Sequence, residues 1–486
     1  MTLIKSISGI RGTIGGPCGD ALTPVDIVKF VYAYCSVMRS QDGFRTVCRK
    51  DTSSAGRVTR RYKVVVGRDA RLSGAMVENL VVGTLTACGV DVIKIGLAST
   101  PTTEMAVTGL KADGGIILTA SHNPRQWNAL KLLDRNGEFL TAEQGAAVLA
   151  CAEKGDFDFA DVDSLGKVKE VDYIQKHIDA VLALDLVDRA AIRKAGFKVA
   201  VDAVNSVGGV IMPRLLRALG VKVVKVNCNP TGNFAHNPEP LPANLTELCG
   251  TVVSSGADLG VSVDPDVDRL ALICEDGQPF GEEYTLVSVA DYVLSATKWT
   301  SKCPYRMATS SNLSSSRALR DVTEKMGGEY RGAAVGEVNV VTKMKEIGAV
   351  IGGEGNGGVI YPALHYGRDA MVGVALFLSN LAHKRMTVSQ LKATYPEYHI
   401  AKNKIQLSDK SLIDKILNSL KEAYSAQDVN TVDGVKISFE AERKWVHLRR
   451  SNTEPIIRIY AEAPTMEEAA ALGEEVVAFA NKIIRA

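Results

Sequence analysis

Short runs of β-branched residues alternate along this chain with longer helix-like segments, and this alternation constrains the fold more than any other feature. The runs are apolar and only a few residues long; they cover residues 64–66, 90–95, 116–118, 199–201, 221–226 and 261–263. Alternation at this spacing favours layered α/β domains. Several runs end in polar, often glycine-rich loops, and ligands bind at strand ends in open α/β sheets. Any single loop of this kind is more often an ordinary βα turn, but several chemically rich loops together favour a binding site.

The length and composition indicate several domains. At roughly 150 residues per domain, 486 residues suggest about three, and 46% hydrophobic residues can supply a core in each. Composition shifts at 151–164, 274–281 and 394–406 instead divide the chain into four units, which we predict to cover residues 1–160, 161–274, 275–394 and 395–486. The last unit is predicted to be α+β, because 434–451 has the pattern of a hairpin and Thr465 with Glu468 forms a capping box before a final helix.

Charge and cysteine content limit the partners and the compartment. Lys and Arg number 57 against 55 Asp and Glu, a net charge of +2, so we expect neither nucleic-acid nor membrane binding. The nine cysteines are scattered without a C-x-x-C spacing, and there is neither a secretory signal pattern nor a long apolar run, so we expect reduced thiols and a cytoplasmic location. The basic stretch 45–63 is interpreted as a solvated loop rather than a binding patch.

The sequence TASHNP at 119–124 places Ser121 directly after an apolar run. A serine hydroxyl becomes a nucleophile when a base or a metal ion assists removal of its proton, and His122 or a bound cation could do so. The alternative is a serine that caps a turn, which is the more frequent role of serine at a strand end.

The sequence DPDVDR at 264–269 places Asp264, Asp266 and Asp268 at alternate positions. Three carboxylates so close together suit a hard, oxygen-seeking cation such as Mg²⁺, although the loop lacks the EF-hand pattern. A solvated acidic turn remains the alternative interpretation.

Two further loops have compositions suited to a phosphorylated sugar. GGEGNGG at 352–358 surrounds Glu354 and Asn356 with glycines, so the backbone can approach a polyhydroxyl ligand closely; a flexible turn is the alternative. RRSNTEPIIR at 449–458 combines guanidinium, hydroxyl and amide groups in the manner of a phosphate site, with a charged strand end as the alternative. Arg11 and Arg68 add guanidinium groups in other glycine-containing loops, where single arginines are usually surface residues.

These four loops, in this order, resemble the α-D-phosphohexomutase superfamily, which includes phosphoglucomutases, phosphomannomutases and phosphoglucosamine mutases. TASHNP resembles the phosphoserine loop, DPDVDR the metal loop, GGEGNGG the sugar loop and RRSNTEP the phosphate loop. The resemblance spans essentially the whole chain. It implies four domains around a central cleft, three similar α/β domains followed by an α+β domain.

The resemblance also implies an isomerase mechanism and its residues. Ser121 would carry a phosphoryl group and, with Asp264, Asp266 and Asp268, would bind one Mg²⁺ ion per chain. A hexose monophosphate would accept the phosphoryl group, the hexose 1,6-bisphosphate would turn around, and its other phosphate would return to the serine. The acid and base candidates are His122, Lys131 and Arg11. The implied substrate-binding residues are Arg269, Glu354, Asn356, Arg449, Ser451, Asn452 and Thr453.

The chain departs from the family pattern at several positions. Gly358 occupies the end of the sugar loop, where many members have a histidine, so the role of that histidine is unfilled or is taken over by another residue. His365 lies close to this position in the sequence. Pro265 and Val267 stand in the metal loop where glycines are common. None of these changes removes a metal ligand, so we expect metal binding to be retained.

The preferred sugar is less constrained than the reaction. The sugar and phosphate loops most resemble phosphoglucosamine mutases, so we expect glucosamine phosphate, with mannose and glucose phosphates as competitors. A metal-dependent sugar phosphatase and a non-catalytic sugar-phosphate binding protein are alternatives from other classes; the separate sugar and phosphate loops disfavour the first, and the presence of the reactive serine, lysine and aspartates disfavours the second. The expected partners are small sugar phosphates, and the chain is expected to be a monomer or a homodimer.

Overall fold

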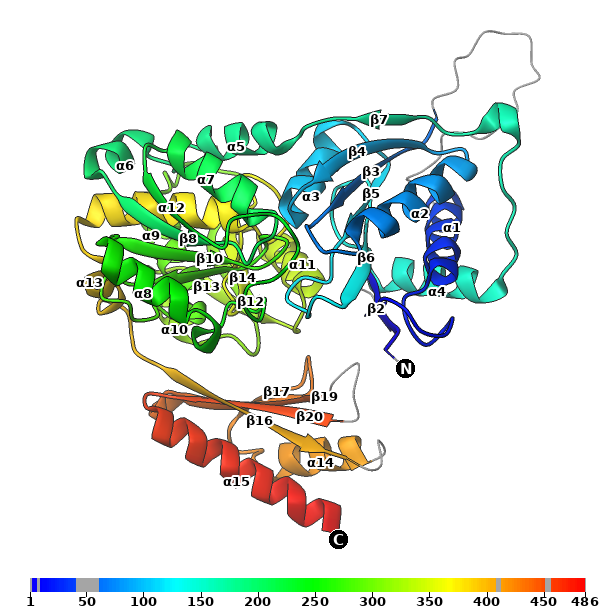
Figure 1. Cartoon of the computed structure of the whole chain (residues 1–486). Helices are drawn as coiled ribbons and strands as arrows, with labels where there is room; N and C mark the ends of the chain where they lie inside the picture. The colour runs from blue at the N-terminus through cyan, green and yellow to red at the C-terminus, as the bar shows by residue number, and fades with distance from the viewer. Residues whose placement is uncertain (1, 7–8, 41–60, 408–411, 451–455, 486) are drawn as a thin grey trace. The chain divides into compact units, whose positions relative to one another are not determined.

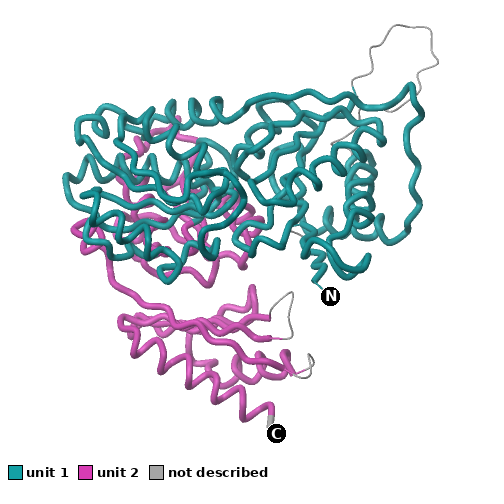
Figure 2. Tube along the Cα trace, in the orientation of Figure 1, with its two compact units in different colours: residues 1–281, 358–388 teal, residues 282–357, 389–486 magenta. Residues whose placement is uncertain are grey.

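The computed structural model describes residues 2–6, 9–40, 61–407, 412–450 and 456–485. The chain divides into two compact units (Figure 2). Unit 1 comprises Met1–Gly281 and Gly358–Val388, and unit 2 comprises Glu282–Gly357 and Ser389–Ala486. The basic stretch lies mostly outside the described residues, as do Ser451, Asn452 and Thr453.

Unit 1 begins with a seven-stranded mixed sheet in the order β1-β2-β6-β5-β3-β4-β7. Its strands are β1 (Ile4–Ser6), β2 (Gly9–Thr13), β3 (Lys63–Arg68), β4 (Asp91–Leu97), β5 (Gly114–Leu118), β6 (Trp127–Leu133) and β7 (Val168–Glu170). Its helices are α1 (Pro24–Ser40), α2 (Gly74–Ala87), α3 (Thr100–Gly109) and α4 (Ala142–Lys154). β3 pairs in parallel with β4 and β5, whereas β6 runs antiparallel to β5 and β2.

Helices cover both faces of this sheet (Figure 1), as the apolar strands require. Val64 and Val66 pack into a core with α1, α2 and α4, while Val65 between them packs into the core formed with α3. Successive side chains of a strand point to opposite faces, so a strand buried on both faces is a continuous apolar run. This accounts for the unbroken β-branched sequence of β3.

A second sheet in unit 1 has the order β11-β10-β8-β9, with β8, β9 and β10 parallel and β11 antiparallel to β10. Its strands are β8 (Lys198–Asp202), β9 (Lys222–Val226), β10 (Leu259–Val263) and β11 (Leu270–Ile273). The remaining elements of unit 1 are α5 (Ile174–Leu182), α6 (Arg189–Ala195), α7 (Gly208–Ala218), α8 (Thr246–Ser255), β15 (Gly358–Ile360) and α12 (Ala370–Lys384).

Unit 2 contains a third α/β segment with the same order of parallel strands. β12 (Arg306–Asn312) lies between β13 (Glu329–Ala333) and β14 (Ala349–Glu354), just as β3 lies between β4 and β5 and β8 between β9 and β10. Its helices are α9 (Glu282–Ala296), α10 (Ala318–Lys325) and α11 (Glu337–Ile347), and α13 (Val388–Lys392) follows α12 in the chain. The predicted similarity of the first three α/β segments is therefore confirmed at the level of strand order.

The C-terminal part of unit 2 is an antiparallel five-stranded sheet in the order β16-β20-β19-β18-β17. Its strands are β16 (His399–Gln406), β17 (Asp428–Asn430), β18 (Val435–Phe439), β19 (Lys444–Arg450) and β20 (Ile456–Ala463), and its helices are α14 (Leu412–Ala423) and α15 (Met466–Arg485). The predicted hairpin is β18 paired with β19. The backbone N–H of Glu468 donates to Oγ1 of Thr465 at 3.2 Å, which confirms the helix start predicted from the capping pattern.

Candidate active site

Three aspartates lie together in the loop between β10 and β11. Asp264, Asp266 and Asp268 are fully buried, and one carboxylate oxygen of each lies within 4.8 Å of the others. Burial raises the pKa of Asp264 well above its usual value, and the neighbouring Asp268 and Asp266 raise it further. Within the described residues, Oδ1 of Asp266 and Oδ1 of Asp268 are buried without a hydrogen-bond partner. A buried, negative, oxygen-lined cluster with unused acceptors is suited to a hard divalent cation.

The backbone of this loop holds the carboxylates in place. Oδ1 of Asp264 accepts the N–H groups of Asp268 and Arg269, each at 3.2 Å. Val267 adopts the left-handed conformation with φ +63°, which explains why glycine suits this position so well. Valine in place of glycine therefore adds a conformational cost to this turn.

Ser121 follows β5 and lies beside the aspartate cluster. Its Oγ donates a hydrogen bond to Oδ2 of Asp264 at 2.8 Å and lies 3.3 Å from Nδ1 of His122. The serine itself has φ +49°, and its backbone N–H donates to Oγ1 of Thr119 at 2.9 Å. The predicted nucleophile and the predicted metal ligands are therefore in direct contact.

The serine loop is held by a buried arginine that the sequence interpretation did not select. Arg71 is fully buried; its Nε donates to Oδ2 of Asp69 at 3.0 Å, and its terminal nitrogens donate to main-chain carbonyls of the serine loop. The carbonyls belong to Ser121, Asn123 at 2.7 Å, Pro124 at 2.8 Å and Trp127 at 3.0 Å. The only sequence signal was the pair of charged residues Asp69 and Arg71 just after β3. The sequence analysis considered Arg68 instead, the last residue of β3, which pairs with Glu78 at 3.6 Å.

Lys131 on β6 reaches two members of the aspartate cluster. Its Nζ donates to Oδ2 of Asp266 at 2.7 Å and to Oδ2 of Asp268 at 3.4 Å. Burial alone lowers the pKa of this lysine, but Asp266 and Asp268 outweigh burial and the pKa is raised overall. Burial likewise favours the neutral form of Asp266, yet Lys131 brings the pKa of that carboxyl below its usual value. Lys131 is thus a fixed cation at this site.

Two more residues support the cluster and were not predicted. Thr100, the first residue of α3, donates from Oγ1 to Oδ2 of Asp266 at 2.6 Å, and its N–H donates to the carbonyl of Asp266 at 2.9 Å. Arg368 donates from Nη2 to Oδ2 of Asp268 at 2.8 Å. These partners lie 166 and 100 residues apart in sequence, so no local pattern indicates them.

The remaining predicted residues of unit 1 surround the same cluster. Burial, with a further contribution from Arg269, lowers the pKa of His122 to about 2. Arg269 donates to Oε1 of Glu239 at 3.1 Å. Arg11 on β2 is paired with Ala129, two residues from Lys131 on the neighbouring strand, so the Arg11 and Lys131 side chains lie on the same face of the sheet. Burial lowers the pKa of Arg11.

The predicted sugar loop lies at the end of β14 in unit 2. Oε1 of the buried Glu354 accepts from Nδ2 of Asn312 at 3.0 Å and from the N–H of Gly336 at 3.2 Å, while Asn356 is half-buried. A Cβ at Gly355 would lie 1.9 Å from Oε2 of Glu283, so any larger residue there must displace that carboxylate. The loop is thus tightly packed around its carboxylate, which excludes the interpretation as a merely flexible turn.

The predicted phosphate loop joins β19 to β20. Arg449 on β19 is directly opposite Arg458 on β20. Like charges opposite one another destabilise a strand pair, and an anion between them would remove that penalty. This pairing fits the prediction of a phosphate site.

His365, considered as a replacement for the missing sugar-loop histidine, lies in unit 1. It is ion-paired with Glu104 and Asp369, at 3.4 and 3.3 Å.

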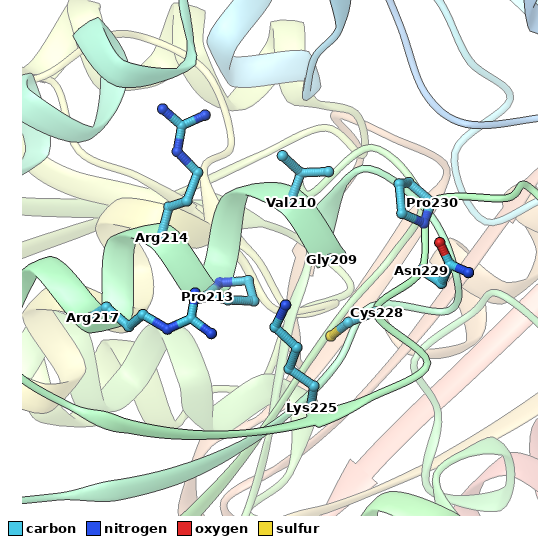
Figure 3. A pocket seen from close by; sticks show the side chains of 9 residues that line it. All are labelled: Gly209, Val210, Pro213, Arg214, Arg217, Lys225, Cys228, Asn229 and Pro230. Atoms are coloured by element: carbon cyan, nitrogen blue, oxygen red, sulfur yellow. The ribbon is translucent and has the colours of Figure 1, made fainter.

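An open hollow beside α7 and β9 is lined by three basic residues, Arg214, Arg217 and Lys225 (Figure 3). None of the predicted site residues that the structure describes lines it.

No helix in the described part of the chain has the length and apolarity needed to span a bilayer.

Comparison with protein families gives four consecutive matches. The models of phosphoglucomutase/phosphomannomutase α/β/α domains I, II and III match residues 3–159, 175–277 and 282–398, and the model of the C-terminal domain matches residues 404–479. The predicted fold class, three α/β domains followed by a distinct C-terminal domain, is confirmed by this order. The domain boundaries that we inferred from composition remain predictions.

Individual proteins match over most of their length. A "Phosphoglucomutase/phosphomannomutase" of Thermococcus kodakarensis is 35% identical, covering 94% of this chain and 95% of that protein. A "Phosphoglucosamine/phosphogalactosamine mutase" of Sulfurisphaera tokodaii is 34% identical, covering 82% of this chain and 87% of that protein. Among solved structures, a phosphoglucomutase/phosphomannomutase family protein of Burkholderia thailandensis matches with a TM-score of 0.81 and 26% identity, covering 99% of this chain and 98% of that chain.

Proposed function

We propose, since the chain belongs to the phosphoglucomutase/phosphomannomutase family, that it interconverts the 1- and 6-phosphates of a hexose through a phosphorylated Ser121 and a bound hexose 1,6-bisphosphate. The chain is a phosphohexomutase and hence an isomerase; the proposal concerns the chemical route and the sugar. One observation carries it: Oγ of Ser121 lies 2.8 Å from Oδ2 of Asp264, at the edge of a buried three-aspartate cluster.

The cluster fits a divalent metal ion because two of its buried oxygens have no partner among the described residues. Asp264, Asp266 and Asp268, together with a phosphate oxygen on Ser121, would hold Mg²⁺. When bound, the ion neutralises negative charge on the transferring phosphoryl group.

The residues around Ser121 support the proton transfers. In the first half-reaction the sugar hydroxyl oxygen forms a bond to phosphorus, the bond from phosphorus to Oγ of Ser121 breaks, and Oγ takes up a proton. His122, whose Nδ1 lies 3.3 Å from Oγ of Ser121, would accept the proton from the sugar hydroxyl once the negative charge of the bound phosphate offsets the burial that lowers its pKa. Lys131, held as a cation by two aspartates, supplies positive charge and a proton donor beside the reacting oxygens. The second half-reaction reverses these steps with the other phosphate.

Unit 2 would bind the parts of the substrate that do not react. Glu354 and Asn356 would contact sugar hydroxyls, and Arg449, Ser451, Asn452 and Thr453 would bind the distal phosphate in either orientation of the sugar. The opposed Arg449 and Arg458 support an anion site at this position. Remote binding energy of this kind positions the reacting end of the substrate.

We propose glucosamine phosphate as the preferred sugar, with glucose and mannose phosphates as the alternative. The composition of the sugar loop supports this choice, as does the relative from Sulfurisphaera tokodaii, which is called a mutase of amino-sugar phosphates. A parallel mutase assay on the 1-phosphates of glucosamine, glucose and mannose, with Mg²⁺ and a trace of the matching bisphosphate, tests it.

The assay has three informative results. A preference for glucosamine phosphate of about tenfold or more, or about 1.4 kcal/mol in transition-state binding, supports the amino-sugar assignment. Equal rates on all three sugars would indicate a phosphohexomutase of broad substrate specificity. Release of free phosphate without the isomeric product contradicts the mutase route and favours a hydrolase, and Ser121→Ala must abolish whichever activity is seen if Ser121 is the phosphoryl carrier.

A further inference from the structure

A second cluster of metal-ligating groups lies in unit 1, separate from the three aspartates. Nε2 of His177 on α5 and Nε2 of His365, in the loop before α12, converge on Oδ2 of Asp369 at 2.9 and 3.3 Å. His177 and Asp369 are fully buried, and the His365 side chain is only 12% exposed. One ligating atom from each of the three residues lies within 4.8 Å of the others.

The outward-facing nitrogens of both imidazoles also have partners. Nδ1 of His177 lies 2.9 Å from Oγ1 of Thr102, and Nδ1 of His365 lies 3.4 Å from Oε2 of Glu104. Histidines that bind metals almost always donate their second ring N–H to a carboxylate or another oxygen, which fixes the ring and leaves the other nitrogen for the ion. Nδ1 of His177 has such an oxygen partner at hydrogen-bond distance, and Nδ1 of His365 faces a carboxylate at ion-pair distance.

The chain keeps space for this arrangement at Gly367. A Cβ at that position would lie 1.9 Å from Oε2 of Glu104 and 2.9 Å from Cε1 of His365. Any other residue would displace the acceptor, the imidazole, or both. The cluster is therefore built by residues from α3, α5 and the segment that leads into α12, and a glycine permits their close approach.

We propose that His177, His365 and Asp369 bind a divalent transition-metal ion of the Zn²⁺ class. Two imidazoles and one carboxylate form a borderline nitrogen and oxygen donor set, which such ions prefer and Mg²⁺ does not. In a tetrahedral zinc site with bonds near 2.0–2.1 Å, neighbouring donor atoms are separated by roughly 3.3 Å. The two nitrogen-to-oxygen distances, 2.9 and 3.3 Å, approach that separation.

Electrostatics at the cluster favour a cation. Burial lowers the pKa of His365, but the carboxylates of Asp369 and Glu104 beside it outweigh burial and raise the pKa to about 10. Both imidazoles must be neutral to bind a metal ion, so metal binding at this site weakens as the pH falls.

The ion would connect elements that also support the three-aspartate cluster. α5 packs against both α3 and α12, and Asp369 is the N-cap residue of α12. Arg368, next to Asp369, contacts Asp268 at 2.8 Å, and Thr100 on α3 contacts Asp266 at 2.6 Å. A metal ion bound by His177, His365 and Asp369 would thus cross-link α3, α5 and the start of α12, which also support the three-aspartate cluster. This inference concerns a different site and does not depend on the proposed mutase route.

The test uses the full chain and Co²⁺ as a spectroscopic probe, with millimolar Mg²⁺ present to fill oxygen-only sites. We expect one Co²⁺ per chain in equilibrium dialysis, with the intense visible absorption of a four- or five-coordinate ion. His177→Gln and His365→Gln each weaken binding at least tenfold and remove the absorption. His236→Gln is the matched control, because His236 also pairs with a buried carboxylate, Asp202 at 3.2 Å, outside the cluster; it keeps full binding.

Several outcomes overturn the inference. The first is the absence of a stoichiometric Co²⁺ spectrum in the wild-type chain. Because this result needs no variant, it holds even if the variants fold poorly. Retained absorption in both histidine variants also contradicts it. Loss of the absorption in Asp266→Asn, with normal absorption in His177→Gln, would place the ion in the three-aspartate cluster instead.

Discussion

Replacing Arg71 by methionine is expected to destabilise the chain and to slow the reaction, because Arg71 holds the serine loop through hydrogen bonds to its main chain. The fully buried guanidinium pairs with Asp69 and donates to four main-chain carbonyls between Ser121 and Trp127. Methionine fills a similar volume without a donor. Asp69 would then be a buried carboxylate without its countercharge, and the carbonyls would lose their donors.

The magnitude follows from burial. Removing one partner of a buried ion pair costs about 3–5 kcal/mol, because the other charge stays buried and uncompensated. The matched control is Arg331→Met. Arg331 forms an ion pair of similar length with Glu329, 2.7 Å against 3.0 Å for Arg71 and Asp69, but its side chain is 63% exposed. Exposed pairs contribute about 0–1 kcal/mol, so this substitution should change the free energy of unfolding very little.

Urea unfolding at pH 7 measures the stability difference, and steady-state mutase kinetics measure the effect on the reaction. We expect kcat to fall at least tenfold in Arg71→Met, because the serine oxygen must be positioned accurately for in-line transfer. Arg71→Lys provides a folded comparison that keeps the charge but cannot donate to four carbonyls at once. Similar stability losses in Arg71→Met and Arg331→Met, or normal kcat in Arg71→Lys and Arg71→Met, would refute the reasoning.

Three other substitutions give smaller or more specific effects. Thr100→Val removes a buried donor to the Asp266 carboxylate and should cost about 1.5–3 kcal/mol in urea unfolding, whereas Thr100→Ser should be close to wild type; equal losses would contradict the hydrogen-bond argument. Burial lowers the pKa of His447 to about 4, so between pH 6.5 and 4 the unfolded chain binds a proton that the folded chain does not. As the pH is lowered through that window, the free energy of unfolding should fall by about 1.4 kcal/mol per pH unit. His447→Gln should remove this part of the pH dependence. Gly355→Ala brings a Cβ within 1.9 Å of the Glu283 carboxylate and should raise KM for the sugar phosphate in the mutase assay; an unchanged KM and Tm would show that the loop can relax.

Local sequence patterns predicted the parts of the fold that depend on local physics. The β-branched runs 64–66, 116–118 and 261–263 lie in β3, β5 and β10, because a strand buried on both faces requires a continuous apolar run. The four loops at strand ends were found for a similar reason, since a cluster of carboxylates or glycines has few uses other than ligand binding or a tight turn.

The residues that sequence reasoning missed act over long distances. Thr100 and Arg368 have ordinary local contexts, and their importance arises only when the fold brings α3 and the segment before α12 to the aspartate loop. Arg71 was overlooked because a charged residue in a loop after a strand is usually exposed, whereas this one is fully buried. His177 and His365 are 188 positions apart, and isolated histidines in a sequence carry no indication that they share one carboxylate.

Backbone strain occurs in both of the loops that meet at Ser121. Ser121 and Val267 both have positive φ, +49° and +63°, and a left-handed conformation costs an L-residue roughly 1–2 kcal/mol. Glycine would avoid this cost at position 267, but it would lose the buried valine side chain, whose burial contributes about 1.5–3 kcal/mol. The two contributions are of similar size, so valine can replace glycine in this turn while Asp264, Asp266 and Asp268 stay together. At Ser121 no buried apolar side chain offsets the strain; the loop conformation there is maintained by Arg71 and by the hydrogen bond to Thr119. The strained serine therefore depends on its supporting residues more than the strained valine does, which is why the substitution at Arg71 is the sharpest test of the site.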